Sequence, residues 1–317
     1  STRTNTLFPY TTLFRSVFLL EARILFRCHN CSVCLGTRCI EELPGMGGVN
    51  QNTNFRLNCA GWNKLLNEVG EYKIKKLSND EVLSLLRYAP VTGAVENIGW
   101  EDEESFYYKM ADALYSAGIK MSIGDGCPDS KLLYGMQSIQ KIQKEKDRGY
   151  RASVFLKPYP DENLYNRVAW ALPIASHIGI DIDSYNIVTM RNKVSLEKKS
   201  ASQIKEIMRR INVPFVLKGV FTKEDIELVK EAKPDIVYIS NHGGRVETRQ
   251  ASTAIMLKEA GPVLKKYCNE LWVDGGIRCK KDIEVAYYYG ASQVLVARPF
   301  IKSLCYKGFI DIAEFLN

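Results

Sequence analysis

Histidine is scarce in this sequence: its 317 residues include only three, His29, His177 and His242. Histidine is the side chain whose ordinary pKa lies closest to neutral pH, so imidazole acid–base chemistry would have to come from one of these positions. His29 stands among cysteines, and His177 stands at the start of a predicted strand, where we expect a structural role. His242 is therefore the candidate catalytic base.

Long apolar runs are missing as well. No run approaches the roughly 18 residues that span a bilayer, and the short apolar stretch at 16–26 lacks the small-residue cleavage site of a secretory signal. The sequence also has no basic stripe interleaved with aromatic residues, because its formal charge of +7 comes from lysines dispersed among acids. We therefore expect a cytoplasmic protein with neither a membrane nor a nucleic-acid partner.

Cysteine is the opposite case, with nine residues that are unevenly distributed. Four of them crowd together near the start and the others are scattered, which does not fit a secreted disulfide framework. Four cysteines this close in sequence can place four thiolates around one metal or cluster, which makes them candidate ligands of an iron–sulfur cluster or of zinc. The alternative is a set of reduced thiols on a loop. The candidate ligands are Cys28, Cys31, Cys34 and Cys39.

The two ends of the chain differ in sequence pattern from its centre. The stretch from Thr6 to Ser16 matches the translation of a common sequencing adapter, so residues 1–27 are interpreted as an adapter artefact or uncertain leader. A cysteine-rich segment is predicted at residues 28–60 and the main domain at residues 61–317. The stretch from Phe309 to Asn317 has the pattern of a final helix that is cut short.

From residue 82 onward, short apolar runs alternate with longer amphipathic segments. Eight strands, each followed by a helix, are the number that closes a (β/α)8 TIM barrel, an α/β fold. The alternative is an open doubly wound sheet. The absence of a G-x-G-x-x-G motif after the first strand argues against it. The predicted strands are Leu83–Ala89, Lys120–Ile123, Ser153–Leu156, Ile178–Ile182, Pro214–Leu217, Ile236–Ile239, Leu271–Val273 and Gln293–Val296.

In such a barrel the residues just past each strand share one face, where the active site lies. The run D-I-V-Y-I-S-N-H-G-G-R places His242, a titratable base, beside Arg245, a fork-shaped carboxylate binder. Two glycines and Arg278 follow the next strand and Arg298 follows the last, which suits a bound phosphate. The other strand ends carry Lys157, Tyr159, Asp181, Asp183 and Lys218.

Four motifs together resemble one family. V-L-K-G, S-N-H-G-G-R, D-G-G-I-R and V-A-R-P-F occur in that order over residues 214–300, as in FMN-dependent 2-hydroxy-acid dehydrogenases and oxidases. The cysteine-rich start and P-G-M-G-G look like a shorter bacterial branch of alpha-hydroxy-acid oxidising proteins. The resemblance implies an FMN-binding barrel that oxidises a small, lactate- or glycolate-like 2-hydroxy acid to the 2-oxo acid.

The resemblance also implies residue roles. His242 would be the base, Arg245 would bind the substrate carboxylate, and Asp183 would orient His242. Tyr159 falls where the family has a substrate-contacting tyrosine. Lys218 would lie against the pyrimidine side of the flavin and support negative charge on the reduced ring. The remaining implied FMN contacts are Lys157, Ser240, Gly275 and Ala297, Asp274 on the ribityl side, and Gly276, Arg278 and Arg298 at the phosphate.

Several positions depart from the family pattern. Asp181 stands where a threonine is usual, Ala297 replaces a glycine, and Thr248 replaces an aspartate. Lys157 replaces a glutamine and, if charged, would raise the reduction potential of the flavin. The family's N-terminal tyrosine and its second substrate-binding arginine have no counterpart. These departures leave the substrate less constrained than the cofactor.

Other functions stay open at this point. One is a different FMN barrel oxidoreductase in which the cysteine cluster relays electrons, and a second is a non-catalytic FMN- or phosphate-binding barrel. A third, a type 2 isopentenyl diphosphate isomerase, shares the barrel and FMN but not the His–Arg motif. The family is often tetrameric, so a homo-oligomer is also open.

Overall fold

Eight parallel strands form the centre of the molecule. A computed structural model of the chain describes residues 53–184, 194–246 and 248–317. Its strands hydrogen-bond in the order β1-β8-β7-β6-β5-β4-β3-β2. Isolated parallel bridges from Arg87 to Lys120 and from Val91 to Ile123 connect the two ends of this order, so the sheet closes on itself. The predicted TIM barrel is confirmed, and the open doubly wound sheet is wrong.

The strands fall where the apolar runs predict them. Their ends shift by at most three residues from the predicted bounds, and those of β6 and β8 do not shift. The strands are β1 Leu86–Tyr88, β2 Ser122–Gly124, β3 Ala152–Leu156, β4 Ala175–Asp181, β5 Phe215–Val220, β6 Ile236–Ile239, β7 Glu270–Val273 and β8 Gln293–Val296.

One correction at the start of a strand concerns β1, which was predicted to begin at Leu83 and begins at Leu86. Ser78 instead begins a short helix, because its side chain accepts a hydrogen bond from the Glu81 backbone while the Glu81 side chain accepts one from the Ser78 backbone. This capping box satisfies backbone groups that a helix start would otherwise leave without partners. The helix runs to Leu85, and the strand follows it directly.

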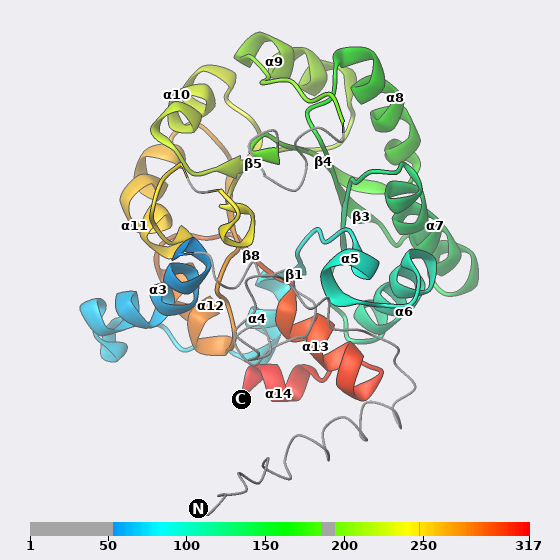
Figure 1. Cartoon of the computed structure of the whole chain (residues 1–317). Helices are drawn as coiled ribbons and strands as arrows, with labels where there is room; N and C mark the ends of the chain where they lie inside the picture. Colours follow the sequence, from blue (N-terminus) through cyan, green and yellow to red (C-terminus); the bar gives the residue numbers. More distant parts are fainter. Residues whose placement is uncertain (1–52, 185–193, 247) are drawn as a thin grey trace, which may run out of the picture.

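Helices surround the strands, with α6 to α12 following one another around the barrel in Figure 1. The expected final helix at Phe309–Asn317 is the shorter α14, which follows α13. The helices are α3 Thr53–Val69, η2 Glu71–Lys73, α4 Asn79–Leu85, α5 Ala94–Ile98, α6 Glu103–Ser116, α7 Ser130–Glu145, α8 Asp161–Ala171, η3 Leu172–Ile174, α9 Ala201–Arg210, α10 Lys223–Ala232, η5 His242–Gly244, α11 Thr253–Leu264, α12 Lys280–Tyr288, α13 Arg298–Lys307 and α14 Ile312–Leu316.

Large aromatic side chains fill the barrel interior. Phe155 from β3 packs edge-on against Tyr238 from β6, with ring centroids 5.5 Å apart, and Trp272 from β7 joins them. The Arg87 guanidinium lies 4.6 Å from the centroid of the Trp272 ring. His177 packs edge-on against the same tryptophan and contacts Ser153 Oγ, which agrees with the predicted structural role. The interior is therefore a packed core, and chemistry is left to the strand ends.

Helix α3 lies beside α11 and α12 and reaches the loop that contains η5 (Figure 1). Phe55, Trp62 and Leu65 on one side of this helix are buried. The helix crosses position 60 without a break, and the domain boundary predicted there stays a prediction.

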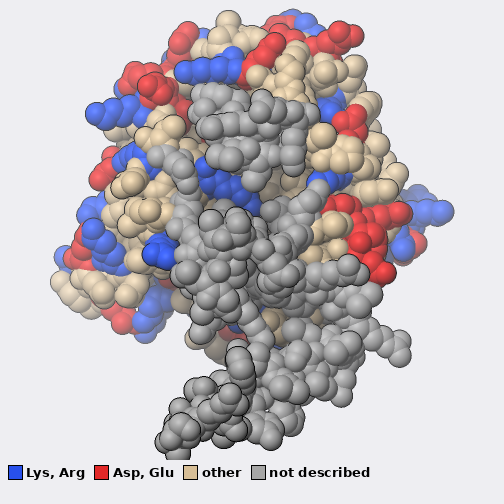
Figure 2. Space-filling view, viewed as in Figure 1, with Lys and Arg blue, Asp and Glu red and all other residues tan. Residues whose placement is uncertain are grey.

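Acidic and basic side chains are interspersed around the rim of the molecule in Figure 2. Within the described ranges, no helix combines the length and the apolar character needed to cross a membrane.

Candidate active site

The loop after β6 has an unusual backbone. His242 adopts φ +56° and is followed by Gly243 and Gly244, also with positive φ. The Asn241 side chain caps this turn by accepting a hydrogen bond from Gly244 N at 3.0 Å. A non-glycine residue in the left-handed region is uncommon and strained, and such residues gather at functional sites. The Asn241 cap therefore stabilises a turn in which His242 has a backbone conformation that is common at functional sites.

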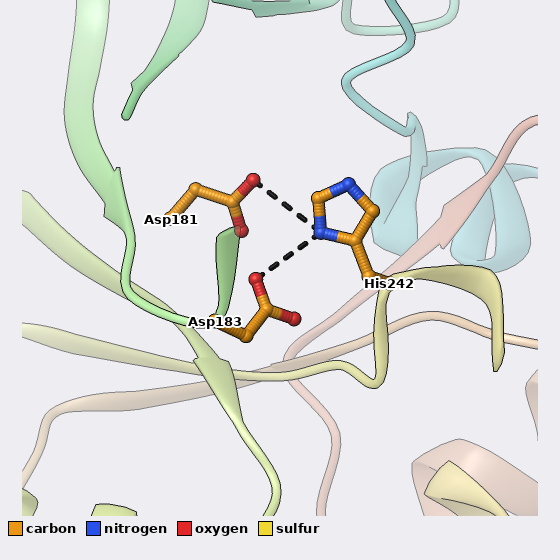
Figure 3. Close-up of side chains that lie close together, drawn as sticks. All are labelled: Asp181, Asp183 and His242. Carbon is orange, nitrogen blue, oxygen red and sulfur yellow. Dashed lines mark hydrogen bonds and ion pairs between the residues drawn. The ribbon is translucent and has the colours of Figure 1, made fainter. Parts of the chain in front are cut away.

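Two carboxylates face the imidazole of His242 (Figure 3). Its Nδ1 lies 3.1 Å from Asp183 Oδ1 and 3.5 Å from Asp181 Oδ2. A nitrogen that faces two acceptors carries the proton, so Nε2 is left as the basic atom. The predicted pairing of Asp183 with His242 is present in the structure, and the proximity of Asp181 is an addition that the sequence did not predict.

The two aspartates differ in charge behaviour. Burial raises the pKa of Asp183 to about 6, and the negative charge of Asp181 acts in the same direction. Burial would also raise the pKa of Asp181, but Lys218 and His242 hold it well below its usual range. Because like charges this close resist joint ionisation, Asp181 carries its charge first.

Lys218, at the end of β5, is the counter-ion of this cluster. Its Nζ lies 2.6 Å from Asp181 Oδ1, and its side chain is almost fully buried. Burial alone would lower the pKa of Lys218, but Asp181 and Asp183 raise it above its usual value. The imidazole and carboxylate atoms of His242, Asp181 and Asp183 lie within 4.8 Å of one another, as in a metal site. The ammonium of Lys218 already supplies a cation there.

A second hydrogen-bonded group joins β6 to β7. Asp274 Oδ2 accepts hydrogen bonds from Tyr238 at 2.8 Å and from Ser240 at 3.0 Å, and Ser240 Oγ also accepts one from His242 N. Burial raises the pKa of Asp274. Its other oxygen, Oδ1, is buried without a hydrogen-bond partner among the described residues. Asp274 therefore retains an acceptor for a polar ligand beside the His242 loop.

The two predicted phosphate-binding arginines converge on one aromatic ring. The Arg298 guanidinium lies 4.2 Å from the Phe55 ring centroid, and the Arg278 guanidinium lies 6.0 Å from it. Arg298 begins α13 directly after Ala297, its N-cap residue. Two cations from neighbouring strand ends thus lie near the same aromatic ring, an arrangement compatible with a doubly charged anion.

The two glycines that precede Arg278 have a structural reason that the sequence did not reveal. Gly275 and Gly276 have positive φ, and an added Cβ at Gly276 would overlap the Asn58 backbone of α3. A Cβ at Gly275 would lie 2.7 Å from Thr253 Oγ1. The sequence-based prediction explained both glycines by the close approach of a phosphate. In the structure, the groups that lie too close for a side chain at these positions belong to α3 and α11.

Lys157 and Tyr159 lie past β3, next to a separate buried cluster. Lys157 N donates a hydrogen bond to Asp125 Oδ2 at 3.3 Å, and the Arg167 guanidinium lies 4.3 Å from the Tyr159 ring centroid. Arg167 also approaches Asp125 at 3.6 Å. The Tyr159 hydroxyl is buried without a hydrogen-bond partner among the described residues. This hydroxyl thus has an unused hydrogen bond, and the substrate contact predicted for Tyr159 stays a prediction.

Arg245 follows His242 in the same turn, and its backbone N–H donates a hydrogen bond to the His242 carbonyl. Asparagines of α3 support this turn. Asn58 and Asn241 exchange amide hydrogen bonds at 2.7 and 3.0 Å. Asn54 donates to the backbone of Val246 and accepts from the backbone of Ala251 at 3.0 Å. Nothing in the sequence marks these two asparagines, because their partners are nearly 200 residues away.

The predicted metal candidates Cys28, Cys31, Cys34 and Cys39 lie outside the described residues. The cysteines within the described ranges form no disulfide with one another, and one of them, Cys59, lies 3.6 Å from an Arg278 nitrogen. The candidate iron–sulfur or zinc site and the alternative of reduced thiols both stay predictions.

Known proteins resemble this chain in sequence and in fold. Bovine (Bos taurus) 2-hydroxyacid oxidase 2 is 37% identical over 105 residues, which are 33% of this chain and 30% of that protein. Glycolate oxidase 3 of Arabidopsis thaliana is 27% identical over 192 residues, 56% of this chain and 52% of that protein. A crystal structure of mandelate oxidase with benzoyl-formic acid superposes with a TM-score of 0.61 and 21% identity over 88% of each chain.

The sequence relatives are matched over only part of their length, about 30% for 2-hydroxyacid oxidase 2. The likeness to mandelate oxidase establishes the barrel fold. The family profile described as FMN-dependent dehydrogenase matches residues 142–317, more than half of the chain and the part that contains β3 to β8. The chain therefore belongs to the FMN-dependent dehydrogenase family.

Proposed function

We propose that this protein uses FMN to oxidise a small 2-hydroxy acid to the corresponding 2-oxo acid. The observation that carries the proposal is the His242 turn, in which Nδ1 contacts Asp183 at 3.1 Å while Arg245 follows three residues later. A base with a fixed tautomer beside a carboxylate-binding arginine is what the oxidation of a hydroxy acid needs.

The residues present fit FMN. Arg278 and Arg298 bring two guanidiniums to one ring, where they suit a phosphate. Asp274 Oδ1, buried and without a partner among the described residues, suits a hydroxyl donor of the ribityl chain. Lys218 provides a buried cation at the end of β5, where it suits the electron-rich side of a flavin. When bound, FMN would accept two electrons together with the α-hydrogen of the substrate.

His242 would take the proton of the substrate hydroxyl at Nε2, because Nδ1 already donates toward the carboxylates. Protonation makes the ring an imidazolium, and the negative charges of Asp181 and Asp183 stabilise that cation at 3.5 and 3.1 Å. A positioned base of this kind typically accelerates a reaction by about 10²–10⁴-fold. The proton would leave the substrate oxygen for His242 while the α-hydrogen leaves carbon with two electrons, which FMN would accept when bound. The substrate would become the 2-oxo acid and His242 would be protonated.

Arg245 would bind the substrate carboxylate through two parallel hydrogen bonds, which fixes the hydroxyl near His242. Tyr159 offers its buried hydroxyl as a further hydrogen-bond donor to the substrate. Within this class we favour lactate- or glycolate-like acids. Support comes from relatives named 2-hydroxyacid oxidase, glycolate oxidase and L-lactate dehydrogenase (cytochrome), although 4-hydroxymandelate oxidase is also among the similar proteins.

The test is an absorption spectrum of the full chain incubated with FMN and then titrated without oxygen. L-lactate, glycolate and mandelate are the titrants. We expect the flavin absorption to bleach with at least one of them and to stay unbleached when His242→Ala is mixed with the same acid.

Bound flavin that none of the three acids bleaches would contradict the proposal and favour an FMN protein with another substrate or none. A folded chain that binds no FMN would contradict the cofactor assignment itself.

A further inference from the structure

Asp181 connects two groups that act at different ends of the proposed site. Its Oδ1 lies 2.6 Å from Lys218 Nζ, and its Oδ2 lies 3.5 Å from His242 Nδ1. Only 7% of Asp181 and 3% of Lys218 are exposed. One carboxylate therefore spans the gap between the cation at the end of β5 and the imidazole after β6, as Figure 3 shows for the imidazole side.

The contact between Asp181 and Lys218 is an ion pair with both partners charged. Burial works against the charged form of each, but Lys218 holds the pKa of Asp181 well below its usual range, and Asp181 raises that of Lys218. Two opposite charges 2.6 Å apart cancel most of each other's field at distances well beyond their separation. Lys218 thus presents a much weaker positive field to its surroundings than an unpaired ammonium would.

The ion pair between Asp181 and Lys218 would affect the reduction potential of a bound flavin. This inference rests on the FMN site of the proposed function but not on its substrate. Reduction adds negative charge to the flavin, so a nearby cation favours the reduced form and a nearby carboxylate opposes it. We propose that Asp181 lowers the reduction potential of bound FMN by neutralising Lys218. Reduced FMN would then be a stronger electron donor, which favours an acceptor of lower potential.

The first test measures the potential of bound FMN by equilibration with a reference dye, without any hydroxy acid. The pH should lie well above the value of about 6 at which Asp183 titrates, so that Asp183 is ionised in every variant. In Asp181→Asn and Asp181→Thr we expect a positive shift, equivalent to at least a tenfold change in the two-electron equilibrium or about 30 mV. Lys218→Met should shift the potential in the negative direction.

Asp161→Asn is the matched control. Asp161 also binds a buried lysine, Lys199, at 2.7 Å, but it begins α8 and does not contact the carboxylate cluster around His242. The same substitution there should leave the potential unchanged. An unchanged or lower potential in both Asp181 variants would overturn the proposal.

The second test uses the full chain without added FMN, so that it reports on the ion pair alone. Either single substitution leaves one buried charge without its partner, which is strongly destabilising, whereas removing both partners is not. We expect Asp181→Asn and Lys218→Met each to lower the melting temperature, and the double variant to lose less than the sum of the two. Strictly additive losses would overturn the pairing on which the proposal depends.

The outcomes separate this inference from the proposed function. A potential that shifts as expected in a protein that oxidises no hydroxy acid would support the role of Asp181 and contradict the substrate. Hydroxy-acid oxidation with an unshifted potential would support the function and overturn the role of Asp181. A chain that binds no FMN would overturn both.

Discussion

His242 Nδ1 and Asp183 Oδ1 lie 3.1 Å apart at the ends of two strands that are not neighbours, β4 and β6. Strand β5 separates them and ends in Lys218, whose ammonium binds the second carboxylate of the group. The three strand ends therefore form one charged unit around the imidazole. Its net charge depends on the protonation of Asp183, because burial brings the pKa of that carboxyl to about 6.

Asp183→Asn should lower the rate of flavin reduction by substrate. An amide can accept the Nδ1 proton but cannot stabilise the imidazolium, so we expect kcat to fall by about 10²–10⁴-fold with little change in KM. Stopped-flow reduction under anaerobic conditions measures this directly. Asp161→Asn serves again as the control, and a variant at Asp183 with undiminished kcat would contradict the role of that carboxylate.

Arg245→Lys should weaken substrate binding while leaving the base in place. Lysine keeps the charge but cannot form two parallel hydrogen bonds with a carboxylate. A charge-assisted hydrogen bond contributes about 1.5–3 kcal/mol, so kcat/KM should fall by roughly 10–100-fold. Steady-state kinetics with a range of hydroxy acids would show it. If the corresponding 2-hydroxy amide, which has no carboxylate, lost as much as the acid, Arg245 would not be the carboxylate binder.

The strands and the His242 turn could be predicted from the sequence because their signals are local. The run Ile236–Ile239 is apolar and β-branched, and the structure makes it a buried strand with the predicted bounds. His242 and Arg245 follow within six residues, so the barrel topology alone puts them on the catalytic face. Asp183 was placed by the resemblance, and its contact with His242 agrees with that placement.

What the sequence could not supply are contacts between distant segments. Asn58 lies 183 residues before its partner Asn241, and neither residue type signals such a pair. The sequence places Asp181 at a strand end and marks it as a departure from the family pattern, but it predicts no partner for it, since the lysine that Asp181 binds is 37 residues away on the next strand. The role of Gly276 was assigned to a ligand because the position of α3 against it depends on tertiary packing.

Asp125 predicts a dependence of stability on pH. Burial raises its pKa to about 6 in the folded chain, whereas an unfolded aspartate titrates near about 3.9. The folded protein then binds more protons than the unfolded chain between these values. The stability that Asp125 contributes is therefore fully present below about pH 4 and is lost as the pH rises through the folded pKa, by up to about 3 kcal/mol.

Urea unfolding of the native sequence and of Asp125→Asn across this interval checks the prediction. The native protein should lose more unfolding free energy than the variant as the pH rises, because the amide does not titrate. Other titrating groups, including Asp183, contribute the same pH dependence of unfolding free energy to both proteins. Parallel curves would mean that Asp125 does not hold its proton in the folded state.

A pair of glycine substitutions separates backbone strain from packing against α3. Gly276 and Gly290 both have positive φ, 78° and 92°, but a Cβ at Gly290 would meet nothing within 4 Å, whereas one at Gly276 would overlap the Asn58 backbone. Gly290→Ala should therefore cost only the left-handed conformation, about 1–2 kcal/mol. Gly276→Ala should cost a further 1–3 kcal/mol, roughly the penalty for forced overpacking, and should also weaken FMN binding by displacing α3 and Phe55 from the arginines. Chemical unfolding and FMN titration of both variants decide the matter: equal losses of stability would show that α3 does not press against this loop.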